Sequence, residues 1–391
     1  MSVEKTLFLI LQQELGEKEN GVSVLENMDH DTYSAILALS KKHSISQIVA
    51  SACAKASSSE IISHDMAQHN KEVMTAFYQS QQRKYVLNEI VKCFDAAKIL
   101  NIPLKGSVIC DYYPEPWMRS SCDVDILIKN EDSERAIACL SKLGYTYQKS
   151  TSIHDHSLFS PTGVHVELHY TLIQEDCLES ANKFLETVWE YTSGEGSSSY
   201  CKKLTNEMFI LYHIAHMAKH FINGGCGIKP FIDLWIIREK MKYEAHTLDQ
   251  MLIEAKMLEF YNVVQDVVDV WFENKDHSRV TQGIEEYIFK GGVYGTLSNV
   301  AAISEAAGEG KMKYLLKLMF MPRESLEIMY PRLERYPILF PYYQVKRWFR
   351  IFKKDKRDKI KNLTDIRNSV SNEEVTATVQ LLDSLGLSKQ V

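Results

Sequence analysis

The sequence predicts an α+β protein in which a small mixed sheet is embedded between N-terminal and C-terminal helical regions. Residues 66–99 repeat apolar side chains at helical spacing, and the clearest are Val86, Ile90, Phe94 and Ala97. Residues 102–170 change to short strand-like segments separated by Pro and Gly. Helical patterning returns after a Gly/Ser-rich stretch at 193–199 and continues to the end, with one break at 223–227.

The first half of the α+β segment predicts two strands. A strand-like piece from Ile102 leads to Lys105, and a short helix over 108–113 precedes the turn that Pro114 and Pro116 impose. Residues 123–128, with the sequence D-V-D-I-L-I, read as the second strand.

The second half of the segment predicts a helix and a hairpin. We expect Ser133 to cap a helix that Gly144 ends. Two alternating segments, 153–160 and 164–170, flank Pro161-Thr162-Gly163, which is typical of a β-hairpin.

Four regions follow from this pattern. They are a helical domain at 1–100, an α+β core at 101–192, a helical domain at 200–340 that we expect to close a cleft over the sheet, and basic and amphipathic helices at 341–391.

Composition excludes several protein classes. Of 391 residues, 45% are hydrophobic and 25% are charged, which excludes a disordered chain, a collagen-like chain and a membrane bundle. The net charge is 45 − 51 = −6, so the surface as a whole is not built for polyanions. No run approaches the length of a membrane span.

The strongest local charge lies near the C-terminus. Residues 346–361 hold nine Lys or Arg and two Asp, interleaved with aromatic side chains. This pattern suits RNA or an anionic membrane surface, while a solvated amphipathic helix that needs no partner is the default interpretation.

The eight cysteines show no C-x-x-C spacing. We therefore expect reduced, mostly buried thiols and a cytoplasmic location. The short apolar run at 7–11 is not a secretory leader.

Asp123 and Asp125 are the first candidate chemical groups. Two residues apart on a strand, they point to the same face and can share a cation. A single D-x-D pattern is common in proteins. Taken alone, it favours an interpretation in which one Asp caps a turn and the other is solvated.

Two neighbouring patterns change that balance. Gly106 and Ser107 stand at a strand-to-helix junction, where backbone amides and a hydroxyl suit a phosphate. His165, Glu167 and His169 share one face of the second hairpin strand, and Glu167 can bring a third carboxylate to a two-metal site.

These motifs together resemble the DNA polymerase beta-like nucleotidyltransferase superfamily and, more narrowly, the bacterial "uncharacterised nucleotidyltransferase" family. The resemblance covers roughly residues 30–350. It rests on L-K-G-S at 104–107, Y-Y-P-x-P at 112–116, Arg119, D-V-D-I-L-I at 123–128, L-G-Y at 143–145, E-L-H at 167–169, H-I-A-H-M-A-K-H at 213–220 and I-D-L at 232–234. The sequence departs from the superfamily at Lys105, where a second glycine is usual, and at Glu167, where aspartate is commoner.

The resemblance implies an enzyme that moves a nucleoside monophosphate from an NTP to a hydroxyl acceptor and releases pyrophosphate. Asp123, Asp125 and Glu167 would hold two Mg²⁺ (or Mn²⁺) ions, and Glu167 would help to deprotonate the acceptor. The residues expected to contact the nucleotide are Lys105, Gly106, Ser107, Arg119 and Lys219. For Arg119, a surface salt bridge is an equally good interpretation, and Lys105 could instead offset charge beside the metals.

A second cluster, His213, His216, Lys219 and His220, lies on one face of a predicted helix. We expect a polar wall of His169, His216, His220 and Asp233 closing over the sheet. Zinc is the weaker interpretation, because H-x-x-H-x-x-x-H lacks cysteine.

The acceptor is open among a sugar or polysaccharide precursor, a peptide or protein hydroxyl, and an RNA end. Two other functions compete with the enzyme. They are a non-catalytic nucleotide-binding or protein-interaction module and a zinc-stabilised histidine-rich module.

Overall fold

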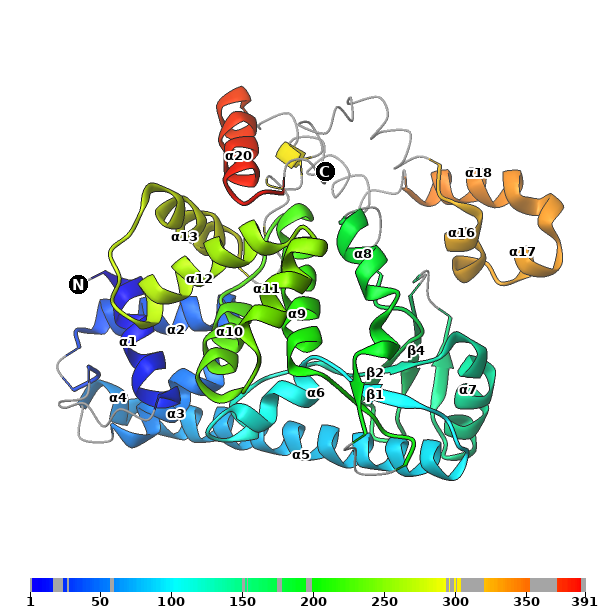
Figure 1. Cartoon of the computed structure of the whole chain (residues 1–391), viewed down its shortest axis with the longest axis horizontal. Coiled ribbons are helices and arrows are strands. Elements are labelled where there is room, and N and C mark those ends of the chain that lie inside the picture. The colour runs from blue at the N-terminus through cyan, green and yellow to red at the C-terminus, as the bar shows by residue number, and fades with distance from the viewer. Residues whose placement is uncertain are drawn as a thin grey trace.

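The computed structural model describes residues 2–16, 24–26, 28–56, 60–149, 152, 154–173, 178–194, 199–292, 295, 299, 301–303, 320–351 and 371–387. It confirms the α+β class: helices surround one five-stranded sheet (Figure 1). A two-stranded ribbon pairs β6 (Thr192–Ser193) with β7 (Lys203–Leu204).

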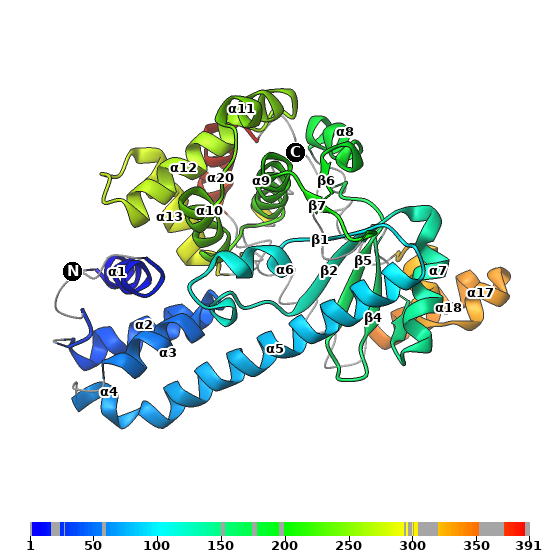
Figure 2. The ribbon, with the colours of Figure 1, turned by 60° about the horizontal axis from the view of Figure 1, so that its bottom comes forward.

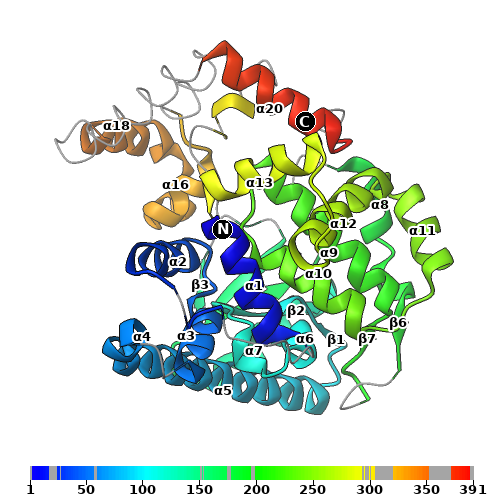
Figure 3. The ribbon, with the colours of Figure 1, turned by 90° about the vertical axis from the view of Figure 1, so that its left-hand side faces the viewer.

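Helices from both ends of the chain share one apolar core. Phe8 of α1 stacks on Trp271 of α12, with ring centroids 4.5 Å apart, and Figure 3 shows α1 lying near α13. The helices of this region are α1 (Val3–Leu15), α2 (His30–Lys42), α3 (Ser46–Lys55), α4 (Glu60–His64), α9 (Asn206–Ile222), α10 (Lys229–Lys240), α11 (Ala245–Glu254), α12 (Leu258–Phe272), α13 (Arg279–Gly291) and α20 (Asn372–Ser384). The four domain boundaries that the sequence suggests stay a prediction.

The long helix expected over 66–99 is α5 (Met66–Ala96), which runs along the sheet (Figure 2). The strands are β1 (Asn101–Pro103), β2 (Asp123–Ile128), β3 (Thr146–Gln148), β4 (Asp155–Phe159) and β5 (His165–His169), in the order β1-β2-β5-β4-β3. The β4–β5 hairpin is confirmed, and β2 and β5 pair in parallel.

The sheet has an apolar face and a polar face because strand side chains alternate. Val124, Ile126 and Ile128 of β2 pack against α5 and against α7 (Ser133–Lys142). The intervening positions of β2 and β5 carry Asp and His side chains on the opposite face. The Val/Ile alternation therefore fixes which face holds the polar groups.

The expected cap at Ser133 is wrong. The 3-10 turn Asn130–Asp132 leads directly into α7, so Asp132 is the N-cap residue and Ser133 already has helical backbone angles. The Ser133 hydroxyl has no hydrogen-bond partner within the described part of the chain. The turn at 223–227 does connect two helices, α9 and α10.

The remaining helices are α6 (Gly106–Ile109), α8 (Glu179–Leu185), α16 (Arg323–Met329), α17 (Arg332–Arg335) and α18 (Phe340–Ile351). Of the basic segment 346–361, only residues 346–351 are described, and they lie in α18. Lys346 lies over the rings of Tyr330 and Tyr343, 5.5 and 5.7 Å from their centroids. None of the helices in the described ranges is both long and apolar enough to cross a membrane.

A disulfide joins Cys93 of α5 to Cys139 of α7, so the expectation of reduced thiols is wrong for this pair. The two cysteines are 46 residues apart in sequence, and only the packing of α7 on α5 brings them together. Among the described residues, cysteines 53, 110, 122, 201 and 226 form no disulfide, and residue 177 lies outside the described residues.

Thiol counting tests this disulfide. The chain has eight cysteines, so one disulfide leaves 8 − 2 = 6 thiols that react in denaturant before reduction and eight afterwards. Cys93→Ser should raise the count before reduction from six to seven, because it frees Cys139. Disulfides are rare in the cytosol, so eight reactive thiols in protein alkylated at lysis would favour the expected cytoplasmic location and would contradict the disulfide.

His43, at the end of α2, makes the fold sensitive to acid. Its side chain is fully buried, packs edge-on against Phe289 of α13, and has no hydrogen-bond partner among the described residues. Burial, with a smaller contribution from Lys42, lowers the pKa of His43 from 6.5 to about 4. Because the unfolded chain binds this proton first, stability is full above pH 6.5 and is lost as the pH falls towards 4.

We expect His43→Leu to reduce the loss of unfolding free energy between pH 7 and pH 5 by about 2 kcal/mol. Urea unfolding at the two pH values measures this difference. His30→Leu is the matched control, because the His30 side chain is exposed. A pH dependence in His43→Leu equal to that of the wild type would contradict the assignment.

Candidate active site

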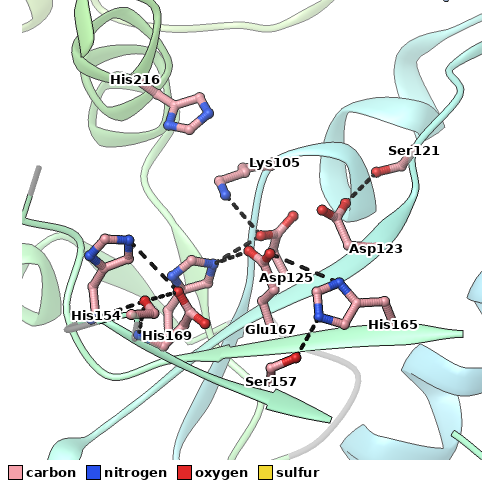
Figure 4. Close-up of polar contacts among 12 residues, drawn as sticks. Lys105, Ser121, Asp123, Asp125, His154, Ser157, His165, Glu167, His169 and His216 are labelled. Atoms are coloured by element: carbon pink, nitrogen blue, oxygen red, sulfur yellow. Dashed lines mark hydrogen bonds and ion pairs between the residues drawn. The ribbon is translucent and has the colours of Figure 1, made fainter. Parts of the chain in front are cut away.

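The polar face of the sheet gathers five titratable side chains from two neighbouring strands. The parallel register of β2 and β5 pairs Asp123 with His165 and Asp125 with Glu167, and His169 follows next to Leu127. Figure 4 shows the five side chains converging above the sheet. The three carboxylates predicted from the sequence are therefore brought together, and two imidazoles lie with them.

Asp125 is buried in a network of charged groups. Its Oδ1 accepts from Lys105 Nζ at 2.8 Å and lies 2.9 Å from His169 Nε2, while only 3% of its side chain is exposed. Burial alone would raise the pKa of Asp125, but Lys105 and His169 hold it well below its usual range. The Asp125 carboxylate is therefore ionised and already paired.

The same interactions favour the charged forms of the two partners of Asp125. Burial opposes the charge on Lys105, but the neighbouring Tyr212 and Asp125 raise its pKa. Burial also opposes the charge on His169, and its hydrogen bonds to Asp125 and then Glu167 raise its pKa.

Lys105 holds an uncommon backbone conformation, with φ 44° and ψ −123°. This is a region that glycine favours, and it costs a side-chain-bearing residue on the order of 1–3 kcal/mol. A glycine would adopt this conformation without that cost. In this chain the ion pair with Asp125 holds Lys105 in place.

Asp123 differs from Asp125 because it has no cationic partner among the described residues. It is half-buried, and its Oδ1 accepts from Ser121 Oγ at 2.8 Å. Asp123, His165 and Glu167 each offer a ligand atom, and these atoms lie within 4.8 Å of one another. Ligands about 2.1 Å from one ion lie at most about 4.2 Å apart, so small movements would suit a divalent cation.

A second candidate group consists of Asp125, Glu167 and His169, whose ligand atoms also lie within 4.8 Å of one another. Here Lys105 and His169 already compensate the buried carboxylate. The residues of the site thus fit a divalent cation best at Asp123.

A small cavity of about 140 Å³ adjoins Asp123 and contains the predicted phosphate-binding residues. Gly106 and Ser107 line it, and the Ser107 hydroxyl has no hydrogen-bond partner in the described structure. A Cβ on Gly106 would lie 3.2 Å from Ser121 Oγ and 3.4 Å from Arg119 Nη1, so this position favours glycine.

Arg83 and Lys84 of α5 also line this cavity, and neither was predicted from the sequence. Burial lowers the pKa of Arg83, although its guanidinium still titrates far above neutral pH. The one available signal, a basic pair within a long helix, is too common to identify a site. Only the crossing of α5 past α6 brings these cations to Ser107.

A larger cavity of about 520 Å³ lies on the other side of the cluster. Ser157 and His165 line it from the hairpin, and Met321, Ser325 and Ile328 line it from the segment that leads into and includes α16. Because His165 pairs with Asp123, the two cavities adjoin the same pair of residues.

Arg119 forms a buried, bidentate ion pair with Asp233 of α10, with hydrogen bonds from Nε at 2.8 Å and Nη2 at 2.7 Å. Tyr113 donates to the same carboxylate at 2.7 Å. Burial would raise the pKa of Asp233, but Arg119 lowers it. Asp233 thus accepts from Arg119 and Tyr113, and this pair attaches the proline-rich turn to α10.

The residues predicted to form a polar wall come from three elements: His216 and His220 lie on α9, His169 lies on β5 and Asp233 lies on α10. His216 and His220 lie with their Nε2 atoms 3.1 Å apart, whereas His213 donates to the Pro230 carbonyl. Burial lowers the pKa of His216 and, with Lys219, lowers that of His220 to about 4, so both are neutral at neutral pH. Figure 4 places His216 above Lys105, and Lys219 lies outside the cavity beside Ser107.

The α9 histidines form no group of three metal-ligating residues within the described ranges. The zinc interpretation therefore has two neighbouring imidazoles, and no third ligand lies with them among the described residues.

Comparison with known proteins identifies the family of the chain. A family model described as "Uncharacterised nucleotidyltransferase" matches residues 29–273, which is more than half of the chain and includes α2 through α12. No match was found among curated proteins or among solved structures. The chain belongs to the uncharacterised nucleotidyltransferase family.

Proposed function

We propose that this protein transfers a nucleoside monophosphate from an NTP to a hydroxyl acceptor and releases pyrophosphate. Family membership indicates a nucleotidyltransferase that uses an NTP. The observation that carries the proposal is the position of Asp123, which belongs both to the acidic cluster and to the cavity lined by Arg83, Lys84 and Ser107.

In this proposal the small cavity receives the β and γ phosphates. Arg83 and Lys84 supply positive charge, and the Ser107 hydroxyl donates to a phosphate oxygen. Gly106 allows the close approach that a side chain would prevent. Arg119 also lines this cavity, but each of its three nitrogens already donates to Asp233 or to the Ser120 carbonyl, so we assign it a positioning role.

During transfer, the acceptor oxygen attacks the α phosphorus, the bond to the pyrophosphate oxygen breaks, and the Glu167 carboxylate takes the hydroxyl proton. A Mg²⁺ or Mn²⁺ ion bound by Asp123 and Glu167 would supply positive charge that stabilises the triphosphate oxygens. Lys105 and His169 fix the orientation of Asp125 beneath them.

The 520 Å³ cavity beside His165 has room for the nucleoside or the acceptor. Its lining combines Lys149 and Gln148 with Phe159, so it offers both hydrogen bonds and an aromatic surface. The acceptor stays open among a sugar or polysaccharide precursor, a peptide or protein hydroxyl, and an RNA end, and a cytoplasmic location is part of the proposal.

One prediction of this proposal concerns triphosphate binding. Arg83→Gln should weaken NTP affinity roughly 10- to 100-fold, because a charge-assisted contact contributes about 1.5–3 kcal/mol. Asp123→Asn should remove the difference in affinity between titrations with Mg²⁺ or Mn²⁺ and titrations with EDTA. Calorimetric titration of each NTP measures both effects and identifies the base.

Lys92→Gln, an exposed position on the same helix as Arg83 and outside the cavity, is the matched control. Equal NTP affinity in the wild type, Arg83→Gln and Asp123→Asn, with metal and with EDTA, would contradict this placement of the triphosphate.

Another prediction of this proposal concerns Glu167 as the base. Glu167→Gln keeps the shape of the side chain but loses the base, so NTP binding should survive while transfer falls by about 10²–10⁴-fold. Glu167→Asp shortens the side chain by one methylene, and activity near that of the wild type would show that the site tolerates either length. The measurement is transfer of label from α-labelled NTP to acceptors in a cell extract.

Glu134→Gln on α7, an exposed position, controls for a general effect of losing one negative charge. If Glu167→Gln transfers label as fast as the wild type, Glu167 is not the base. If the wild type binds NTP but transfers no label, the non-catalytic nucleotide-binding function takes precedence.

A further inference from the structure

The two aspartates of β2 face very different surroundings. Asp125 is paired through one oxygen with both Lys105 and His169, and its side chain is 3% exposed. Asp123, two residues earlier, has only the Ser121 hydroxyl as a hydrogen-bond partner in the described chain. One carboxylate is therefore already compensated by the protein, and the other is not.

The backbone of Lys105 directs its ammonium group to Asp125. Its φ of 44° lies where glycine is favoured, yet the residue is a lysine whose Nζ lies 2.8 Å from Asp125 Oδ1. An additional cation at Asp125 would have to displace this ammonium group from a buried ion pair.

His165 is oriented towards the carboxylates by a hydrogen bond on its far side. Its Nε2 lies 2.8 Å from Ser157 Oγ, and its Nδ1 faces Glu167 at 4.0 Å from Oε1. With the proton on Nε2 donated to Ser157, Nδ1 offers a lone pair beside Asp123 and Glu167. A metal ligand commonly has its other ring nitrogen held in this way.

We propose that the site binds a single divalent cation through Asp123, His165 and Glu167, and that the Lys105 ammonium group takes the place of a second cation at Asp125. This inference rests on the proposed function and narrows the expected two ions to one. A mixed imidazole and carboxylate set favours Mn²⁺, or another first-row transition metal, over Mg²⁺, which prefers oxygen ligands.

The test titrates Mn²⁺ and Mg²⁺ by calorimetry into metal-free protein without a histidine tag and without nucleotide. The wild type should bind one Mn²⁺ per chain and prefer Mn²⁺ to Mg²⁺. Two Mn²⁺ per chain, or none at millimolar metal, would overturn the proposal.

Lys105→Gly suits the backbone conformation and removes the ammonium group, so the stoichiometry should rise from one Mn²⁺ to two. Lys98→Gly is the matched control, because Lys98 also has a positive φ, 54°, but is exposed on the loop after α5. It should bind one Mn²⁺. One Mn²⁺ bound by folded Lys105→Gly would overturn the role of Lys105.

Lys105→Gly leaves Asp125 paired with His169 but without its ammonium partner until metal binds. The double variant Lys105→Gly/Asp125→Asn therefore removes the carboxylate charge together with the ammonium charge. It should bind one Mn²⁺, as the wild type does, and a second bound ion would overturn the assignment of that position to Asp125. If Lys105→Gly does not fold, the wild-type stoichiometry and the His165 variants still decide the proposal.

His165→Asp converts the ligand set to oxygen alone, so the ratio of Mn²⁺ to Mg²⁺ affinity should fall at least tenfold. Ser157→Ala should weaken Mn²⁺ binding by about 10- to 100-fold, as expected when a hydrogen bond to a metal ligand is lost. An unchanged affinity ratio in His165→Asp would overturn the role of His165.

NTP affinity, measured separately, distinguishes the two proposals. Retained NTP binding that depends on Arg83, together with two bound Mn²⁺, overturns only the single-cation inference. Absence of NTP binding together with absence of Mn²⁺ binding would contradict the proposed function as well.

Discussion

The buried ion pair between Lys105 and Asp125 is the interaction on which the rest of the site depends. Removing one partner of such a pair costs about 3–5 kcal/mol, because the other charge is left buried without compensation. The pair joins β2 to the residue that begins the turn into α6. It therefore fixes Asp125 beneath the cluster and also positions Gly106 and Ser107 beside Asp123.

Because side chains alternate on two parallel strands, one face of the sheet packs in the apolar core and the other face holds the candidate site. Val124, Ile126, Val166 and Leu168 face α5 and α7 and are almost fully buried, so they hold the sheet without taking part in the site. The intervening positions are free to carry carboxylates and imidazoles. Because β2 and β5 run in parallel, Asp123 and His165 meet at the same end of the sheet, where both cavities open.

Long-range pairing, more than local pattern, limits what the sequence reveals. The strand at 123–128 and the hairpin follow from alternation and turn residues, and the three carboxylates follow from the strand period. The partner of Arg119 is 114 residues away on another helix, and no local pattern identifies it. The Cys93–Cys139 disulfide and the Arg83 contribution likewise depend on how α5 packs.

The expected roles of individual site residues remain predictions, but the contacts of Lys105 and His165 favour other roles for these two residues. The sequence treats Lys105 as a nucleotide contact, whereas its ammonium group is engaged with Asp125. The sequence places His165 on the same strand face as Glu167, and its hydrogen bond to Ser157 turns one ring nitrogen towards the carboxylates. The backbone angle of Lys105 and the hydroxyl of Ser157 determine these orientations, and neither can be inferred from the spacing of residues in the sequence.

Attack at the α phosphate can be tested without knowing the acceptor, because water can slowly take the place of the acceptor hydroxyl. Phosphorus NMR of NTP incubated with the wild type and Mn²⁺ distinguishes the two possible cleavage positions. We predict a nucleoside monophosphate and pyrophosphate, absent with Asp123→Asn prepared in the same way. Formation of a nucleoside diphosphate and inorganic phosphate by the wild type, but not by the variant, would contradict attack at the α phosphate.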